Sequence, residues 1–168
     1  AAALSDCGPE LLAVARALAA PLATSLGARG IISTRHPLHV GVVGNYSAPP
    51  ANEIVCGAEM ILYVGCDTGD QLTHYWRVPK PGQLRIVQID ADPLEFHRSY
   101  AAECTVQADP KAALGALAQA LGRPDRDGGY LAWAQGLMEA WRASVASRLS
   151  SDAAPIDPAR LAAEITKA

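Results

Sequence analysis

The sequence is poor in aromatic residues, in clusters of positive charge and in long apolar stretches. The last two of these absences each exclude a class of protein. Phe, Trp and Tyr make up 5% of its 168 residues. The net charge is -3, and no run of Lys and Arg is present that could bind nucleic acid or an anionic membrane. No apolar stretch approaches the roughly 20 residues of a membrane span, and the Ala-rich N-terminus lacks the basic flank of a secretory signal. We therefore expect a cytoplasmic protein with no nucleic-acid and no membrane partner.

Several familiar site motifs are also absent. The four cysteines are far apart and form no Cys-x-x-Cys, so we expect reduced structural thiols and no metal. His36 and His39 have no third ligand near them in the sequence, which favours loop residues over a zinc site. Neither Gly-x-Gly-x-x-Gly nor a Gly-Lys-Ser/Thr phosphate loop occurs.

Two short apolar runs dominate the part of the chain that is most informative. Met-Ile-Leu-Tyr-Val at 60–64 and Ile-Val-Gln-Ile at 86–89 are rich in β-branched and aliphatic residues, which is typical of buried strands in a parallel sheet. We expect both to be central strands. They end at Gly65-Cys66-Asp67 and at Asp90-Ala91-Asp92, and in open α/β sheets ligands bind beyond the carboxyl ends of the strands. Any site is expected there.

The remaining elements follow from prolines, caps and periodicity. Asp92-Pro93 and Asp109-Pro110 each place an N-cap Asp before Pro at the first helical position. We expect strands at 22–25 and 104–107, and helices that begin at Gly8 or Pro9, Pro49, Pro93, Pro110 and Pro158. An irregular connection is expected over 26–45 and a long loop over 65–82. An amphipathic helix is expected over 130–150, between linkers at 122–129 and 151–155. The first helix lacks a preceding strand and the last ends abruptly, so we expect a piece of a longer chain.

The order of these segments resembles the central domain of thiamine-diphosphate-dependent enzymes of the acetolactate synthase and 2-keto acid decarboxylase type. The residues that carry the resemblance are Pro21-Leu22-Ala23-Thr24-Ser25, Arg29-Gly30, His36-Pro37-Leu38 with Gly41 and Gly44, Ala58-Glu59-Met60-Ile61-Leu62-Tyr63-Val64-Gly65, Thr73 with Trp76, Ile86-Val87-Gln88-Ile89-Asp90-Ala91-Asp92-Pro93, and Ala108-Asp109-Pro110-Lys111. Residues 155–168 are similar to the linker and opening helix of the diphosphate-binding domain that follows.

The resemblance implies a fold and a set of domains. The fold is a six-stranded α/β Rossmann-like parallel sheet flanked by helices, the deoxyhypusine-synthase-like NAD/FAD-binding fold, with its first strand missing here. The implied division is a central domain over 1–121, a linker with the amphipathic helix over 122–154, and the start of a truncated diphosphate-binding domain over 155–168. The implied partners are the pyrimidine- and diphosphate-binding domains of the same enzyme, and the parent is expected to be a homo-oligomer.

The resemblance places thiamine diphosphate and Mg²⁺ in the parent enzyme but not on these residues. In the family, a glutamate of the pyrimidine domain activates the thiamine ring, and a Gly-Asp-Gly to Asn motif holds the metal. This sequence has Gly69-Asp70 followed by Gln71, and Asp109 preceded by Ala108. We therefore expect a fragment that is not catalytic by itself and binds no thiamine diphosphate.

Some relatives bind FAD or ADP on this domain, at the strand ends. Carried over by position, the implied cofactor-binding residues are Thr24, Ser25, Leu26, Gly65, Cys66, Asp67, Asp90, Asp92 and Asp109. Flavin-binding relatives commonly have Arg where this chain has Asp67, and a carboxylate repels a pyrophosphate. Two interpretations stay open, a nucleotide site and a purely structural crevice, and Asp90, Asp92 and Asp109 serve equally well as helix caps.

Three functions follow from these observations. The first is a structural central domain of an enzyme that decarboxylates or ligates 2-keto acids. The alternative is a free-standing FAD- or ADP-binding module. A hydrolase with Cys66 as nucleophile is disfavoured because Val64 and Thr68 stand where a nucleophile elbow needs glycines.

Overall fold

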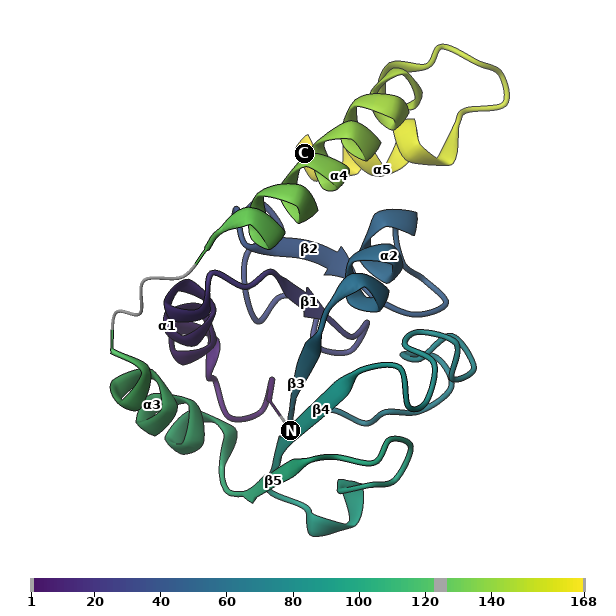
Figure 1. Cartoon of the computed structure of the whole chain (residues 1–168). Helices are drawn as coiled ribbons and strands as arrows, with labels where there is room; N and C mark the ends of the chain where they lie inside the picture. The colour runs from purple at the N-terminus through teal and green to yellow at the C-terminus, as the bar shows by residue number, and fades with distance from the viewer. Residues whose placement is uncertain (1, 123–126, 168) are drawn as a thin grey trace.

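The protein is an α/β structure with helices on both sides of parallel strands (Figure 1). The computed structural model describes residues 2–122 and 127–167. Its elements are α1 (Gly8–Leu18), β1 (Leu22–Thr24), β2 (His39–Val42), α2 (Pro49–Gly57), β3 (Met60–Val64), β4 (Arg85–Asp90), the 3-10 helix η1 (Pro93–Glu95), β5 (Cys104–Gln107), α3 (Pro110–Leu121), α4 (Gly129–Val145), the 3-10 helix η2 (Ala146–Ser150) and α5 (Pro158–Lys167).

All strand pairs in the described part of the chain are parallel, which confirms the predicted α/β Rossmann-like class. They form two sheets, β1-β2 and β3-β4-β5, instead of the six-stranded sheet that the resemblance implies. β4 is central, as predicted, with Ile86 and Ile89 buried. The prediction that β3 is also a buried central strand was wrong. Among the described residues β3 pairs with β4 alone and lies at a sheet edge, and none of its residues is buried.

One strand falls inside the connection that we expected to be irregular. β2 pairs with β1 through the register Leu22↔His39 and Thr24↔Val42. Its sequence, His-Val-Gly-Val, did not predict a strand, because Gly41 interrupts the apolar pattern. Gly41 has a φ of +99°. Burial of Val40 and His39 against neighbouring elements stabilises a strand that its own sequence does not favour.

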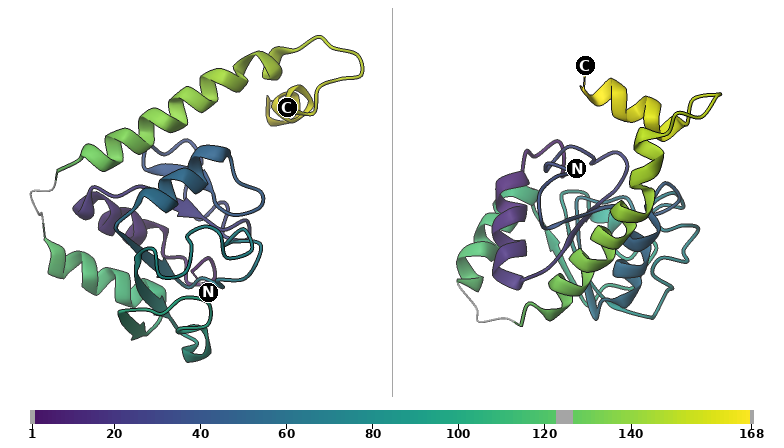
Figure 2. Two further views of the ribbon diagram at one scale, coloured as in Figure 1. Left: turned by 45° about the vertical axis from the view of Figure 1, so that its right-hand side comes forward. Right: turned by 90° about the horizontal axis from the view of Figure 1, so that it is seen from above.

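Helices α1 and α3 lie side by side on one side of the molecule and cover β4 (Figures 1 and 2). Val14, Ile89 and Leu114 form the buried centre of this core together with Ala2 and Cys7. Leu11 and Leu18 of α1 pack against it.

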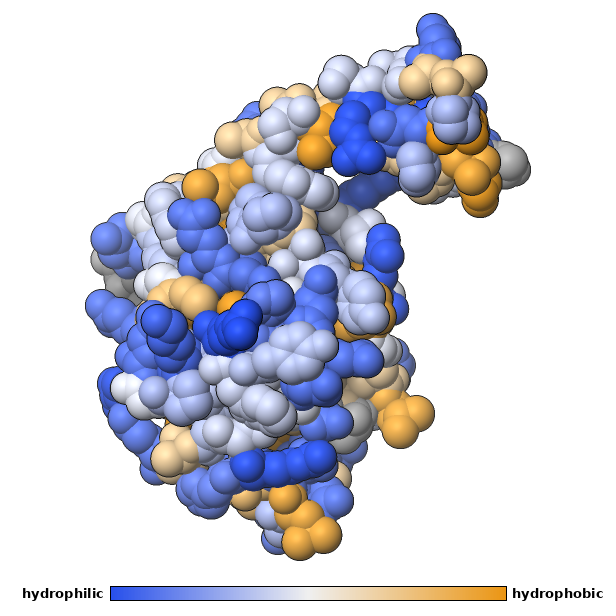
Figure 3. All heavy atoms as spheres, turned by 90° about the vertical axis from the view of Figure 1, so that its right-hand side faces the viewer, coloured by the Kyte–Doolittle hydropathy of each residue, from blue (hydrophilic) through white to orange (hydrophobic). Residues whose placement is uncertain are grey.

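Helix α4 packs against α2 and β2 and builds a second core from Val40, Ile54, Ala134 and Met138. The Tyr130 hydroxyl of α4 donates a hydrogen bond to the Ile54 carbonyl oxygen. Figure 2 shows α4 running past α2 and ending beside α5. Figure 3 shows that this end of the molecule projects from the main body and carries apolar residues at its surface. The predicted single helix over 130–150 is instead an α-helix to Val145 followed by η2.

Prolines open most of the helices, as predicted. α1, α2 and α3 each have Pro within their first two positions, and α5 begins at Pro158. Two of the three predicted caps are confirmed: Asp92 Oδ1 accepts from the Leu94 N–H at 2.9 Å, and Asp109 Oδ1 from the Ala112 N–H at 3.0 Å. Asp90 is not the N-cap of a helix; its Oδ1 accepts from the Asp92 N–H at 3.0 Å. Asp157 Oδ1 accepts from the Ala159 N–H at 2.7 Å at the start of α5. No helix within the described residues has the length and apolar character needed to cross a bilayer.

Candidate functional site

A crevice lies beyond the carboxyl ends of β1 and β3. It contains a cavity of about 530 Å³ whose walls include Tyr46, Asp70 and Gln71. A smaller cavity of about 220 Å³ shares Gly65 and Asp67 with it and is also lined by Glu95. Of the nine predicted site residues, seven line one or both cavities: Ser25, Leu26, Gly65, Cys66, Asp67, Asp90 and Asp92.

The other two predicted residues lie outside the cavity walls. Thr24 is buried, and its Oγ1 is 3.4 Å from His39 Nε2. Asp109 caps α3, and that hydrogen bond to the Ala112 N–H lowers the pKa of its carboxyl. The structure gives both residues a role in folding.

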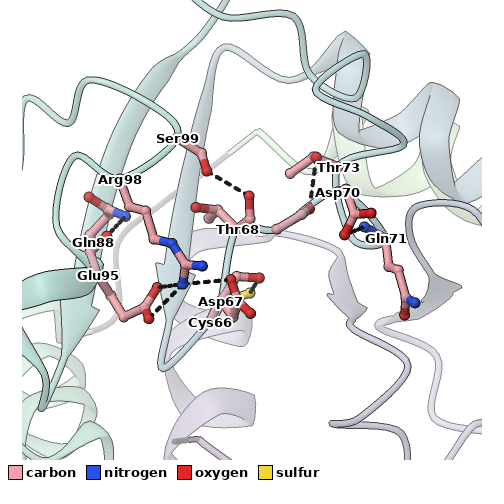
Figure 4. A network of polar contacts seen from close by, with 11 residues as sticks. Cys66, Asp67, Thr68, Asp70, Gln71, Thr73, Gln88, Glu95, Arg98 and Ser99 are labelled. Carbon is pink, nitrogen blue, oxygen red and sulfur yellow. Dashed lines mark hydrogen bonds and ion pairs between the residues drawn. The ribbon is translucent and has the colours of Figure 1, made fainter.

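The β3–β4 loop that forms one wall is held in an unusual backbone conformation. His74, Tyr75 and Trp76 all have positive φ, between +48° and +57°. Thr73 is fully buried, and its Oγ1 donates to the Gly69 carbonyl oxygen at 2.8 Å (Figure 4). The same Oγ1 accepts from the Trp76 N–H at 3.0 Å. These bonds hold in place the segment that carries Asp67 and Asp70.

Two of the charged side chains around the crevice, Asp67 and Glu95, meet at Arg98 (Figure 4). Its Nη1 lies 2.9 and 3.1 Å from the two Glu95 carboxylate oxygens and 3.1 Å from Asp67 Oδ1. Both carboxylates belong to the cavity walls, and neither wall includes a Lys or Arg among the described residues. Five acidic side chains surround the two cavities: Asp67, Asp70, Asp90, Asp92 and Glu95.

The Cys66 thiol lies in the larger cavity wall, but its surroundings suppress its reactivity. Burial, and then the negative charge of Asp67, raises the pKa of Cys66 to about 12. A nucleophilic cysteine needs a depressed pKa or an adjacent base. The arrangement therefore gives no support to the hydrolase hypothesis.

Comparison with known proteins identifies the family. Residues 1–117 match the family model described as thiamine pyrophosphate enzyme, central domain. The chain belongs to this family. The resemblance inferred from the sequence is thereby confirmed.

The relatives of this central domain include several kinds of enzyme. It is 31% identical over 118 residues to the probable acetolactate synthase large subunit of Methanocaldococcus jannaschii, an alignment that covers 70% of this chain and 20% of the relative. It is 31% identical over 120 residues to the probable 2-ketoarginine decarboxylase AruI of Pseudomonas aeruginosa (71% and 21%). Identity to pyruvate oxidase of Lactiplantibacillus plantarum is 29% over 112 residues (66% and 18%). The chain spans about a fifth of the length of these curated relatives.

The central domain's own residues fit neither thiamine diphosphate nor a nucleotide diphosphate. Gly69-Asp70 continues with Gln71, whose N–H donates to Asp70 Oδ1, and no group of three potential metal ligands occurs in the described residues. At the crevice, acidic residues line both cavities without a Lys or Arg among the described lining residues, and their negative charge would repel a diphosphate. The start of α2 does not compensate, because it begins Pro49-Pro50 and therefore lacks two of the N–H groups that could cradle a phosphate.

The sequence missed the residue that organises these charges. Arg98 comes from the segment after η1 and meets Asp67 from 31 positions away. The only local signal was the Glu95-x-x-Arg98 spacing, which places opposite charges near each other. Tyr46, Asp70 and Gln71 were missed because their loops gave no periodic pattern.

Proposed function

We propose that this chain serves as the mainly structural central domain of an enzyme that uses thiamine diphosphate to decarboxylate or ligate 2-keto acids. The family match over residues 1–117 carries the proposal. Relatives named as an acetolactate synthase large subunit, a 2-ketoarginine decarboxylase and a pyruvate oxidase support 2-keto acids as the substrate class. In this proposal thiamine diphosphate and Mg²⁺ are bound by the pyrimidine- and diphosphate-binding domains of the parent.

The proposed domain limits are 1–121, 122–154 and 155–168. Helix α3 ends at Leu121, which supports the first boundary. Helix α5 buries none of its residues, and Leu161 and Ile165 on it are exposed, which suits the first helix of a further domain. The central domain would then position its neighbours, and the parent is proposed to be a homo-oligomer.

The test compares the complete parent polypeptide with the 168-residue chain. Carbon dioxide release from pyruvate and other 2-keto acids is measured with and without thiamine diphosphate and Mg²⁺. We expect cofactor-dependent turnover by the parent, and neither turnover nor cofactor binding by the 168-residue chain. A parent that turns over no 2-keto acid, or a short chain that binds thiamine diphosphate tightly, would contradict the proposal.

A nucleotide role for the crevice has one observation in its favour, the size and position of the larger cavity. The five surrounding carboxylates oppose it. The alternative of a free-standing FAD- or ADP-binding module therefore requires direct support. Yellow colour, or adenine absorbance that stays with the protein through gel filtration, would supply that support.

A further inference from the structure

Arg98 is a cation held between two carboxylates from separate segments. Asp67 comes from the β3–β4 loop and Glu95 from η1, and both bind the same guanidinium nitrogen, Nη1. The Arg98 side chain is 50% exposed, and the Asp67 side chain is 67% exposed. Hydrogen bonds and charge, and not close packing, therefore hold Arg98 in this position.

The surroundings of Arg98 are strongly negative. Asp90 and Asp92 line the smaller cavity with Asp67 and Glu95, and Asp70 lines the larger one. The acidic residues at the crevice thus carry more negative charge than Arg98 can balance. The positive charge of Arg98 is already neutralised by the two carboxylates that it contacts. An incoming diphosphate would be repelled by the carboxylates that line the two cavities.

The backbone offers no substitute for a free cation. The first-turn N–H groups of helices are the usual anion donors in this class of fold. Pro49 and Pro50 remove two of them from α2, and in α3 the Asp109 carboxylate already accepts the Ala112 N–H. Helix α1 likewise has Pro9 at its start.

We infer that Asp67 and Glu95 set the ligand selectivity of the crevice: by engaging Arg98 they make it reject diphosphate-bearing ligands. Neutralising both carboxylates frees Arg98 to bind phosphate oxygens. The selectivity resides in these three side chains and not in the shape of the cavity. This inference concerns the crevice alone and is independent of the activity of the parent enzyme.

The experiment measures ADP binding to the 168-residue chain by calorimetry at low ionic strength. The double variant Asp67→Asn with Glu95→Gln removes both partners of Arg98 and preserves side-chain shape. The matched control, Asp70→Asn with Asp92→Asn, changes the net charge equally at the same crevice but removes no contact of Arg98. Asn keeps the cap at position 92. Adenosine serves as the uncharged probe, and circular dichroism checks folding.

We expect no saturable ADP binding by the unaltered chain, and binding by the Asp67/Glu95 variant that is at least about tenfold tighter than by the matched control. The gain should shrink at high salt and disappear when Arg98→Gln is added. The inference is overturned if the unaltered chain already binds ADP, if the two double variants behave alike, if the gain survives loss of Arg98, or if adenosine gains as much as ADP.

Discussion

Gly44 lies so close to Gln71 that a Cβ on Gly44 would be 2.0 Å from the Gln71 carbonyl oxygen. The contact joins the segment after β2 to the β3–β4 loop. It is reinforced by the Asn45 N–H, which donates to the same oxygen at 2.9 Å, and by Asn52, whose side chain bonds both the N–H and the carbonyl of Gly44. A wall of the crevice depends on this approach, since Gln71 and Leu72 line the larger cavity.

Gly44→Ala should therefore be among the most damaging small substitutions. Gly44 has a φ of +98°, so alanine adds backbone strain to the clash, and we expect a loss of about 3 kcal/mol in the free energy of unfolding. Gly82→Ala is the matched control, because its φ of +77° is strained but its Cβ would meet nothing within 4 Å. Urea unfolding should show a loss of about 1 kcal/mol there. Equal losses would mean that the close approach has no energetic weight.

His39 should make stability depend on pH. Burial of its imidazole, with repulsion from Arg142 and Arg29, lowers the pKa of His39 below the ordinary 6.5. Between the folded pKa and 6.5, the imidazole is therefore protonated in the unfolded chain and neutral in the folded protein. The free energy of unfolding falls as pH decreases through this range. His39→Gln should flatten this part of the profile. Its loss of stability below about pH 4 should remain, because Asp109 and Asp157 have lowered pKa values. An unchanged slope near pH 6 would argue against a buried neutral His39.

Cys66 should react slowly with alkylating reagents. The thiolate is the reactive form, and a pKa of about 12 leaves little of it at pH 8. Cys104 is exposed on β5 and provides an internal reference. Iodoacetamide treatment followed by peptide mass spectrometry should therefore label Cys104 well before Cys66. Faster labelling of Cys66 would revive the nucleophile hypothesis.

Helix α4 should unfold together with the domain that precedes it. Met138 and Ile54 are 4% and 2% exposed in the core that α4 shares with α2. Met138→Ala should cost about 2–3 kcal/mol, whereas Glu139→Ala, at an exposed position on the same helix, should cost almost nothing. A double-mutant cycle with Ile54→Ala should give a coupling above about 0.5 kcal/mol. Equal effects at 138 and 139 would show that α4 contributes nothing to the folded unit.

The sequence was most informative where structure is local. The strand at Met60–Val64 and the helix starts at the Asp-Pro pairs 92–93 and 109–110 depend on neighbouring residues alone, and these elements were confirmed, although the position of β3 in the sheet was not. β2 was hidden because Gly41 interrupts it and its pairing with β1 is a tertiary interaction. The division into two sheets was equally hidden, because which strands pair is decided by distant parts of the chain.

The crevice was likewise predictable from the sequence only in part. Its position at the strand ends followed from the strands themselves, and seven of the nine predicted residues line it. Its electrostatic character did not follow. The bridge from Arg98 to Asp67 joins residues 31 positions apart, so no spacing rule could have predicted it.

The separation of the strands into two sheets has a consequence for how this polypeptide meets others. Within the described residues, β1 and β3 each have a strand neighbour on one side only. An open edge of a parallel sheet presents a row of backbone donors and acceptors that any extended segment can use, whatever its side chains. Pairing of this kind would add an extended segment to the sheet at β1 or β3 through main-chain hydrogen bonds, and it would increase with protein concentration.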